Sequence, residues 1–360
     1  MNIKSLLLGS AAALVAATGA RAADAIIIAE PEPMEYVRIC DMYGAGFFYI
    51  PGTENCLKIG GYVRYEMRYT DPEFGDDSFT KYARFAPTFD VRNETEWGTL
   101  RGFAELRVNW ASGQVVGFDG LGDPVYGATT AIQLNHAFIE LQQAMGTFRI
   151  GKGDTPYSRF LGYGSPFGPF DADYGFQNSG EVSYTFNGGN GFSAILAAVE
   201  ISDSDEFDVG AELGVNFTQG WGNIGAMVGY DTSVEEFGAK IAANGNLGML
   251  ALGGQVFYSS GANSWYQVGK DALWENDSEF SALVYAKANV SEKLAIAGAF
   301  QWYDTEYDAG FDNAWEVTAG LDWRPVNGLR IRPEVQYGSV DTIVGDASAW
   351  RSTIRFDRSF

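Results

Sequence analysis

From Leu57 to the end of the chain the sequence repeats one pattern: about ten residues that alternate between apolar and polar, a turn, and alternation again. A period of two predicts strands whose two faces meet different surroundings. Sixteen such runs can be counted, the faintest at 147–153 and within 207–243. They span approximately 57–70, 80–95, 99–110, 131–143, 147–153, 180–187, 191–201, 207–218, 221–231, 234–243, 247–259, 279–290, 293–304, 315–325, 328–338 and 348–360.

The connections between the runs indicate the architecture. Those after every second run, from the second to the fourteenth, have two or three residues: EWG, AMG, GGN, QG, NGN, SE and VN. Most of the others are longer, at 71–79, 111–130, 154–179, 260–278, 305–314 and 339–347, whereas those after 201 and 231 are short and break the rule. Short turns at one end and long loops at the other are typical of an outer-membrane β-barrel. An even number of strands places both of its ends on the short-turn side.

The two faces of the runs indicate lipid outside and water inside. In 328–338 one face carries Leu329, Ile331, Pro333, Val335 and Tyr337, and the other carries Arg330, Arg332, Glu334 and Gln336. A soluble sandwich also alternates, but it buries its apolar face between two sheets. Here aromatic residues mark both ends of the apolar face, as with Trp315 and Trp323 or Trp350 and Phe360, which is the girdle of a membrane barrel. Lipid forbids an open sheet edge, so the sequence predicts an all-β, sixteen-stranded antiparallel transmembrane barrel with an aqueous lumen.

Composition limits the compartment and the partners. Residues 1–22 have a lysine at position 4, an apolar run and an Ala20-Arg21-Ala22 cleavage site, so they predict a secretory signal peptide. Its removal takes the formal charge from −22 to −24, because Lys4 and Arg21 are lost. Such acidity argues against a nucleic-acid partner. No cofactor motif is present; GKGDT at 151–155 lacks the spacing of a phosphate-binding loop.

Residues 23–56 precede the first strand and form the expected periplasmic N-terminal tail and disulfide loop, ahead of the barrel at 57–360. Cys40 and Cys56 are the two cysteines of the chain. In an exported protein the simplest interpretation is a disulfide, worth about 3 kcal/mol for a loop of this length. Zinc binding or redox catalysis needs further ligands or a CxxC motif.

The stretch 154–179, DTPYSRFLGYGSPFGPFDADYGFQNS, fits neither a strand nor a helix over most of its length. A connection this long inside an ordered chain is usually functional or disordered. Its many aromatic residues argue against disorder. We therefore expect it to fold inward, to pack against the wall and to present acidic residues to the lumen.

At this point the mature chain resembles the general porins of alphaproteobacterial outer membranes. The most specific similarity is VRICDMYGAGFFYIPGTENCLKIGGYVRYE, in which the cysteine pair, the IPGT turn and the first strand occur together. KYARFAPTFDVR at 81–92, FRIGKGDTPYSRF at 148–160 and the closing IRFDRSF add to it. The resemblance implies a homotrimer of sixteen-stranded barrels, each with its third outer loop, here 154–179, folded into the pore.

The resemblance also implies individual roles. Tyr82-Ala83-Arg84 matches the family motif whose arginine lines the constriction, and Asp171 matches the acidic loop tip approximately. Phe360 matches the C-terminal signal read by the barrel insertase, although Arg358 stands where that signal usually has an apolar or aromatic residue.

Alternation places a sector of arginines on the lumen side, on the first three runs and the last three. Facing Asp171 and Asp173 of the inward loop, such a wall sets pore width and charge preference. We predict a constriction formed by Arg64, Arg84, Arg92, Arg107, Asp171 and Asp173. The simpler alternative is that each arginine pairs with a lumen carboxylate, such as Glu66, Asp90, Glu105 or Glu334, and only solvates the wall.

The function predicted is a passive outer-membrane channel for small hydrophilic solutes and ions, without catalysis. A barrel enzyme acting on lipid or peptide is the first alternative, and it would use His136, the single histidine, as its base. Loss of a hydrolytic activity in His136→Ala would support it. The second alternative is a mainly structural barrel that tethers the outer membrane to the cell wall. In that case the α-amine of Ala23 would be the acceptor for attachment to peptidoglycan; the simpler interpretation of the tail is that it is unattached. The acidic stretches 71–77 and 202–208 lack calcium-loop spacing, so they are either solvated or bridged through divalent ions to lipopolysaccharide.

Overall fold

The computed structural model describes residues 38–73, 75–118, 123–164, 172–201, 208–262, 264–269, 277–304, 311–343 and 345–360. The chain divides into two units, Met1–Arg38 and Ile39–Phe360, and the second contains every strand described below. The predicted signal peptide, Ala23 and most of the N-terminal tail lie outside the described residues.

A short η1 turn at Asp41–Tyr43 and the α2 helix at Pro156–Arg159 are the helical elements within these ranges. The strands there are β1 (Phe48–Tyr49), β2 (Cys56–Pro72), β3 (Ser78–Thr95), β4 (Gly98–Phe118), β5 (Pro124–Gln143), β6 (Gly146–Asp154), β7 (Asn178–Gly189), β8 (Phe192–Glu200), β9 (Val209–Gln219), β10 (Gly222–Asp231), β11 (Glu236–Leu247), β12 (Leu250–Ser259), β13 (Phe280–Asn289), β14 (Leu294–Asp304), β15 (Phe311–Trp323), β16 (Leu329–Thr342) and β17 (Gly345–Ser359). No helix in the described part of the chain is long and apolar enough to cross a membrane.

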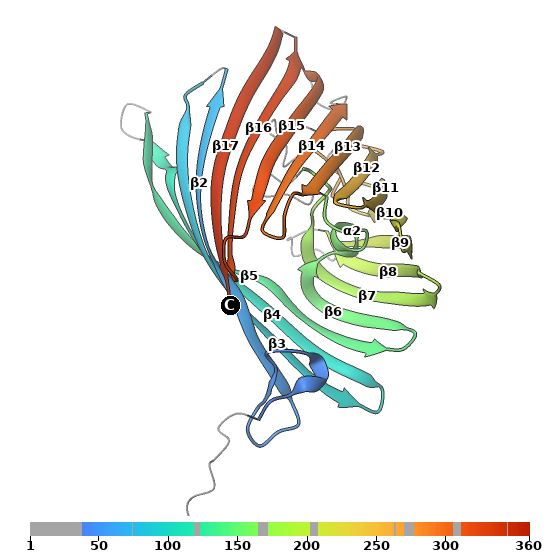
Figure 1. The fold of residues 1–360 in the computed structure, drawn as a ribbon. Coiled ribbons are helices and arrows are strands. Elements are labelled where there is room, and N and C mark those ends of the chain that lie inside the picture. Colours follow the sequence, from blue (N-terminus) through green and yellow to red (C-terminus); the bar gives the residue numbers. More distant parts are fainter. Residues whose placement is uncertain are drawn as a thin grey trace, which may run out of the picture. The chain divides into compact units, whose positions relative to one another are not determined.

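The sheet closes on itself, as predicted (Figure 1). From β2 to β17 each strand pairs antiparallel with the next in the sequence, and β17 returns to pair with β2 from Ala349↔Pro72 to Ser359↔Tyr62. Because β17 pairs with β2, neither strand has unpaired backbone groups along this ladder. The hydrocarbon of a membrane requires such pairing, since it offers no water to satisfy free N–H and C=O groups. Within the described residues the unit is therefore a sixteen-stranded antiparallel barrel, and the short β1 is added beside the start of β2.

The alternation read from the sequence is confirmed by the burial of the two faces. On β15 and β16, Val317, Leu321 and Val335 are exposed on the outside, whereas Glu316, Thr318 and Glu334 are buried on the inside. Aromatic rings continue from strand to strand over the outer face. The ring centres of Trp315 and Tyr337 are 5.5 Å apart, and those of Tyr337 and Trp350 are 4.6 Å apart. Such a belt matches the interface girdle of a membrane barrel.

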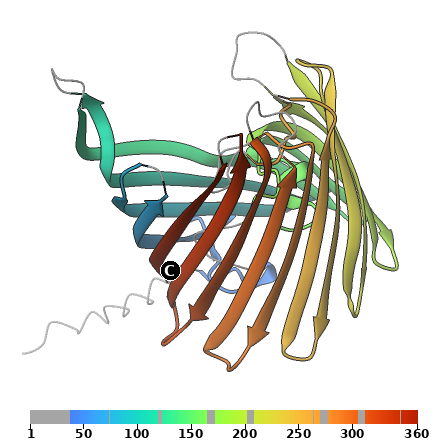
Figure 2. The ribbon, with the colours of Figure 1, turned by 90° about the horizontal axis from the view of Figure 1, so that it is seen from above.

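One predicted loop is wrong. Residues 111–130 were expected to be a connection, yet β4 runs to Phe118 and β5 begins at Pro124, and the hairpin projects beyond its neighbours (Figure 2). The pairing of β4 with β5 shifts register at Ser112/Gln114 and Val115/Gly117. Each bulge moves the following side chains to the other face and so interrupts the alternation that marks a strand. Gly113, with φ +78°, supplies the left-handed backbone at the first of them.

The lengths of several other connections also differ from those predicted. Strands extend into 71–79, 305–314 and 339–347, which shortens these connections. The connection after β8 is longer than predicted, because β8 ends at Glu200 and β9 begins at Val209. The faint runs are confirmed as strands, at β6 and at β9 to β11.

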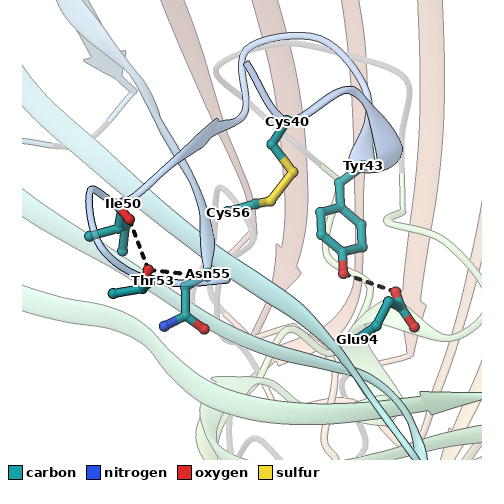
Figure 3. Close-up of a disulfide and its surroundings, with 7 residues drawn as sticks. All are labelled: Cys40, Tyr43, Ile50, Thr53, Asn55, Cys56 and Glu94. Atoms are coloured by element: carbon teal, nitrogen blue, oxygen red, sulfur yellow. Dashed lines mark hydrogen bonds between the residues drawn. A yellow bond between two sulfur atoms is a disulfide. The ribbon is translucent and has the colours of Figure 1, made fainter. Parts of the chain in front are cut away.

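The segment ahead of the first long strand forms a small cap, defined here as residues 39–55. Cys40 and Cys56 are joined by the predicted disulfide (Figure 3). The IPGT turn is closed by the Thr53 hydroxyl, which donates to the Ile50 carbonyl at 2.9 Å and accepts from the Asn55 N–H at 3.1 Å. Both cysteines are buried with Phe47, so the disulfide lies inside a small apolar cluster.

Candidate functional site

A chain of ion pairs crosses the lumen face from β3 to α2. Its links are Arg92–Asp90 (2.8 Å), Asp90–Arg101 (2.9 Å), Arg101–Glu140 (3.0 Å), Glu140–Arg149 (2.6 Å), Arg149–Glu181 (3.3 Å) and Glu181–Arg159 (2.8 Å). Because Arg159 lies on α2 and Glu181 on β7, the last link fixes the start of the 154–179 stretch to the wall. The sequence prediction did not include Arg101, Arg149 or Arg159. The alternation that Arg101 shares with Arg107 could have identified the first.

The four arginines predicted for the constriction all lie on the lumen face of β2, β3 or β4. Arg64 pairs with Asp357 at 2.6 Å and Arg107 with Glu105 at 2.7 Å, while Arg92 belongs to the chain just described. Glu66, another predicted partner, accepts from Arg68 at 3.0 Å and from Arg355 at 2.5 Å.

Arg84 differs from the other three. Its Nε donates to the Asn109 side chain at 2.6 Å and its Nη1 to the Tyr62 hydroxyl at 3.4 Å. Both acceptors are neutral, and among the described residues no carboxylate pairs with it. Its positive charge is therefore the least compensated of the four.

The described parts of 154–179 lie against the lumen face of the opposite wall. α2 contacts β8, β9 and β10 (Figure 1), and the Tyr157 N–H donates to Glu212 Oε2 on β9 at 2.7 Å. The two ends of the stretch are joined, because the Ser158 hydroxyl donates to the Gln177 carbonyl at 2.8 Å and accepts from the Gln177 N–H at 2.6 Å. Burial raises the pKa of Tyr157, and of Tyr163, whose hydroxyl donates to Asp154 at 2.7 Å.

Lys240 on β11 is the only basic residue between 180 and 259, and it is covered. Only 1% of it is exposed. Its Nζ donates to the Tyr174 carbonyl at 2.9 Å and lies 4.3 Å from the centre of the Tyr157 ring. This cation holds both arms of the 154–179 stretch and offers no charge to the lumen.

The described parts of a second connection, 260–278, join the first on the lumen face, which the sequence prediction missed. The Gly269 N–H donates to Asp173 Oδ2 at 2.6 Å, and the Gln177 side-chain amide donates to the Trp265 carbonyl. The rings of Tyr266 and Tyr157 are 4.9 Å apart. The aromatic pair at 265–266 is the sequence signal that could have revealed it.

The two connections pack against strand positions that are glycine. We call this set of glycines the glycine seat: Gly210 and Gly214 on β9, Gly225 and Gly229 on β10, and Gly238 on β11. A Cβ atom at Gly229 or Gly238 would overlap Tyr266, and one at Gly225 would overlap Leu161. Glycine within a strand often marks such a close approach. The glycines that gave these runs a faint strand pattern are the positions where the connections are seated.

The two acidic residues predicted for the constriction have different positions. Asp171 lies outside the described residues. Asp173 is 5% exposed, and its carboxylate accepts the Gly175 N–H at 3.0 Å as well as the Gly269 N–H. The carboxylate of Asp173 therefore joins the two connections.

His136 is a wall residue packed between Phe103 and Phe138, with ring centres 6.0 and 6.3 Å away. Its Nε2 lies 3.8 Å from Asp154, which already accepts from Tyr163 and Asn178. No serine or threonine hydroxyl among the described residues bonds to His136. The geometry expected for a hydrolytic base beside a nucleophile is therefore not assembled in the described part of the chain.

Comparison with known proteins decides the family. The family model described as the porin subfamily matches residues 24–354. Porin Omp2b of Brucella canis is 38% identical over 382 residues, and that of Brucella neotomae 39% over 385, with all of both chains covered in each case. The chain belongs to the porin subfamily. It is an outer-membrane porin, and membership suggests a channel rather than an enzyme.

Solved structures share the fold of this porin at low identity. The channel DcaP of Acinetobacter baumannii is 14% identical with a TM-score of 0.64, covering 87% of this chain and 99% of its own. The anion-selective porin of Comamonas acidovorans is 12% identical with a TM-score of 0.60, covering 85% and 100%. The trimer form of OmpT from Vibrio cholerae is 13% identical with a TM-score of 0.59, covering 86% and 100%.

Proposed function

We propose that this porin is a passive, water-filled channel for small hydrophilic solutes and ions, narrowed by the 154–179 stretch. The supporting observation is the uneven covering of the lumen face. The described parts of 154–179 and 260–278 pack against β8 to β11, whereas the arginines of β2 to β4, β16 and β17 form the other side. Solutes pass between the seated connections and the arginine side, and a barrel of sixteen strands is wide enough to hold water there.

Charge selection in this proposal comes from Arg64, Arg84, Arg92, Arg107, Asp171 and Asp173. Arg84 contributes most, because its partners Asn109 and Tyr62 are neutral and leave its charge in place. The other three arginines each have a carboxylate within 2.8 Å. A fixed charge beside a narrow aqueous path selects ions by sign and size.

Planar-bilayer recording tests the channel. Deletion of 167–174 removes the tip of the stretch and leaves the wall in place, so the single-channel conductance in KCl rises. Deletion of 203–207, in the connection between β8 and β9, is the control and leaves the conductance unchanged. Unchanged conductance in a folded 167–174 deletion contradicts the constriction. Absence of conductance in the unmodified protein contradicts the channel itself.

We also propose that the porin assembles as a homotrimer through the projecting β4–β5 hairpin. β5 pairs with β6 only from Ala137 to Gln143, so 124–136 has no strand beside it on that side among the described residues. This edge is apolar, with Ile132 75% exposed and Tyr126 and Leu134 exposed beside it. An exposed apolar edge readily pairs with another chain. Native mass spectrometry gives trimers for the unmodified protein and monomers for Ile132→Lys, while trimers in both contradict this interface.

In this proposal the apolar outer face contacts outer-membrane lipid and lipopolysaccharide. A separate part of the proposal is that the barrel insertase recognises the C-terminal residue, Phe360. Phe360 is exposed and stacks on Phe85, with 6.3 Å between ring centres. Phe360→Ala lowers the amount of heat-modifiable barrel in the outer membrane, whereas Phe85→Ala does not. Equal amounts for all three proteins contradict the role of Phe360.

A further inference from the structure

The short-turn end of the barrel contains a cavity of about 530 Å³ on the arginine side. Its basic lining residues are Arg64 of β2, Lys293 of the β13–β14 turn, Arg324 of the β15–β16 turn, and Arg330 and Arg332 of β16. Asp357 of β17 is the one carboxylate among the lining residues. The cavity lies beside two short turns, and it shares Arg64 with the proposed constriction but contains no residue of 154–179.

Two carboxylates hold these cations in place. Asp357 accepts from Arg64 Nε and from Arg332 Nη2, both at 2.6 Å. Asp322 lies behind the lining and accepts from Arg330 Nε at 2.7 Å and from Arg330 Nη2 at 2.8 Å. It also pairs with Arg324 and with Lys287, each at 3.2 Å. The side chain of Asp322 is 9% exposed and that of Asp357 12%, so both carboxylates are largely covered where they hold the guanidinium groups of the cavity.

The positive charges outnumber the negative ones. Five basic side chains line the cavity, and the lining contains one carboxylate, Asp357, with Asp322 behind it. Guanidinium donors also remain available. Arg330 and Arg324 donate hydrogen bonds to Asp322 through Nε and Nη2. Among the described residues no acceptor is hydrogen-bonded to their Nη1 groups. Arg324 is the most exposed of the four lining arginines, with 56% of its side chain exposed.

We propose that this cavity is a binding subsite for small organic phosphates and other multivalent oxyanions at the short-turn mouth of the pore. Guanidinium groups bind phosphate oxygens with paired, charge-assisted hydrogen bonds. A cleft lined by charges of one sign also concentrates counter-ions near its walls. The volume is within the range of small-molecule sites, about 300 to 1,000 Å³. The subsite rests on the proposed channel function, and it gives that channel a class of preferred solute.

Side-specific block tests the subsite. Pyrophosphate added to the short-turn side of a bilayer holding the unmodified porin reduces the KCl current in a saturable way, and higher KCl weakens the block. Addition from the long-loop side requires a higher concentration. In Arg324→Gln/Arg330→Gln the half-blocking concentration rises at least tenfold. Arg358→Gln is the matched control, because it removes a positive charge at the same end without removing a lining residue, and it leaves the block unchanged.

Equilibrium dialysis of labelled pyrophosphate against the detergent-solubilised porin is the second measurement, and it does not depend on conductance. Binding to the unmodified protein and to Arg358→Gln, but not to the double variant, supports the subsite even if no channel opens. A porin that conducts KCl but neither binds nor is blocked by pyrophosphate overturns the subsite and leaves the channel function standing. Equal binding by all three proteins also overturns it.

Discussion

On the β9–β11 side of the barrel the lumen wall is lined with glycine, and on the side formed by β15 to β17 and β2 to β4 it is lined with arginine. Tyr266, Leu161 and Phe160 cover the glycines. Carboxylates pair with most of the arginines, at 2.5 to 2.9 Å in the pairs of Arg64, Arg92, Arg101, Arg107 and Arg355, and in the described part of the chain only Arg92 of these is covered, by the cap. The first side is packed like a protein core, and the second is built to face water.

The difference follows from the free energy of burial. A glycine strand can be covered at no electrostatic cost, because it has no side chain to desolvate. Covering an arginine removes a charge from water and costs several kcal/mol unless hydrogen bonds replace the hydration. Lys240 is the exception on the glycine side, and Tyr174, the Tyr157 ring and the nearby carboxylates of Glu212 and Asp173 compensate it. The residue types of the two walls therefore account for the position of the water path that we propose.

The largest effect is expected from filling the glycine seat. Gly229→Leu puts a side chain where the Tyr266 ring lies, and overpacking of this kind costs about 1–3 kcal/mol. The barrel keeps its ladder, so the strain is relieved by release of 260–278. We expect a higher and noisier single-channel conductance. Gly102→Leu is the control, since no heavy atom lies within 4 Å of a Cβ at that position. Equal conductance in the two variants would break the contrast between the walls.

The same substitution at Lys240 on the glycine side and at Lys287, which pairs with Asp322 of β15 on the arginine side, tests the electrostatic part of the comparison. Lys240→Met leaves the buried Tyr174 carbonyl without its Lys240 donor, and an unsatisfied buried polar group costs about 1–3 kcal/mol. Lys287→Met removes one of three cations on Asp322, where Arg324 and Arg330 remain, so the expected loss is about 0–1 kcal/mol. Chemical unfolding in detergent measures both. Similar losses for the two variants would show that the walls do not differ in this respect.

A smaller effect concerns ion selectivity. Arg84→Ala shifts the reversal potential in a salt gradient toward cations, because the charge of Arg84 is not offset by a carboxylate. Arg107→Ala shifts it less, since Glu105 stands 2.7 Å from Arg107. Asp173→Asn shifts it slightly toward anions, because that carboxylate is buried among backbone N–H groups. At physiological salt, charges beyond about 8 Å of the path are screened. A larger shift for Asp173→Asn than for Arg84→Ala would reverse the assignment.

The fold could be predicted because lipid and water impose alternation on every strand that crosses the membrane. Where a bulge breaks the alternation, as at Gly113, the prediction ended the strand too early. The arginines on the lumen face followed from the same alternation, and the proposed carboxylate partners Glu66, Asp90 and Glu105 are found paired.

The seating of the connections could not be predicted in the same way. It depends on contacts between residues distant in the chain, such as Tyr266 with Gly229 and Asp173 with Gly269. A glycine in a strand has no hydrophobic signature, so its role as a seat is visible only when its partner is known. For the same reason, Asp173 could be identified as an acid of the stretch, but its use as a link between two connections could not.

The smallest expected effect is on the stability of the cap, whose aromatic residues contact the arginine side. Tyr43 and Phe47 cover Arg92, with ring centres 5.8 and 5.2 Å from its guanidinium carbon. The Tyr43 hydroxyl donates to Glu94 Oε1 at 2.9 Å. Burial and this carboxylate raise the pKa of Tyr43 to about 12, from an ordinary value of 10.0. The raised pKa means that the hydrogen bond stabilises the cap fully below pH 10, and that the stabilisation is lost as pH rises from 10 through 12.

The rate at which a phosphine reduces the Cys40–Cys56 disulfide reports opening of the cap. In the unmodified porin we expect the rate to rise between pH 10 and 12, beyond any change in a small disulfide measured alongside. Tyr43→Phe lacks the hydrogen bond, whose net worth of about 0.5–1.5 kcal/mol corresponds to a rate about 2- to 10-fold higher below pH 10. Because phenylalanine does not titrate, this variant shows no further rise above pH 10. A rise of equal size in both proteins would mean that another group opens the cap and that Tyr43 contributes nothing to the covering of Arg92.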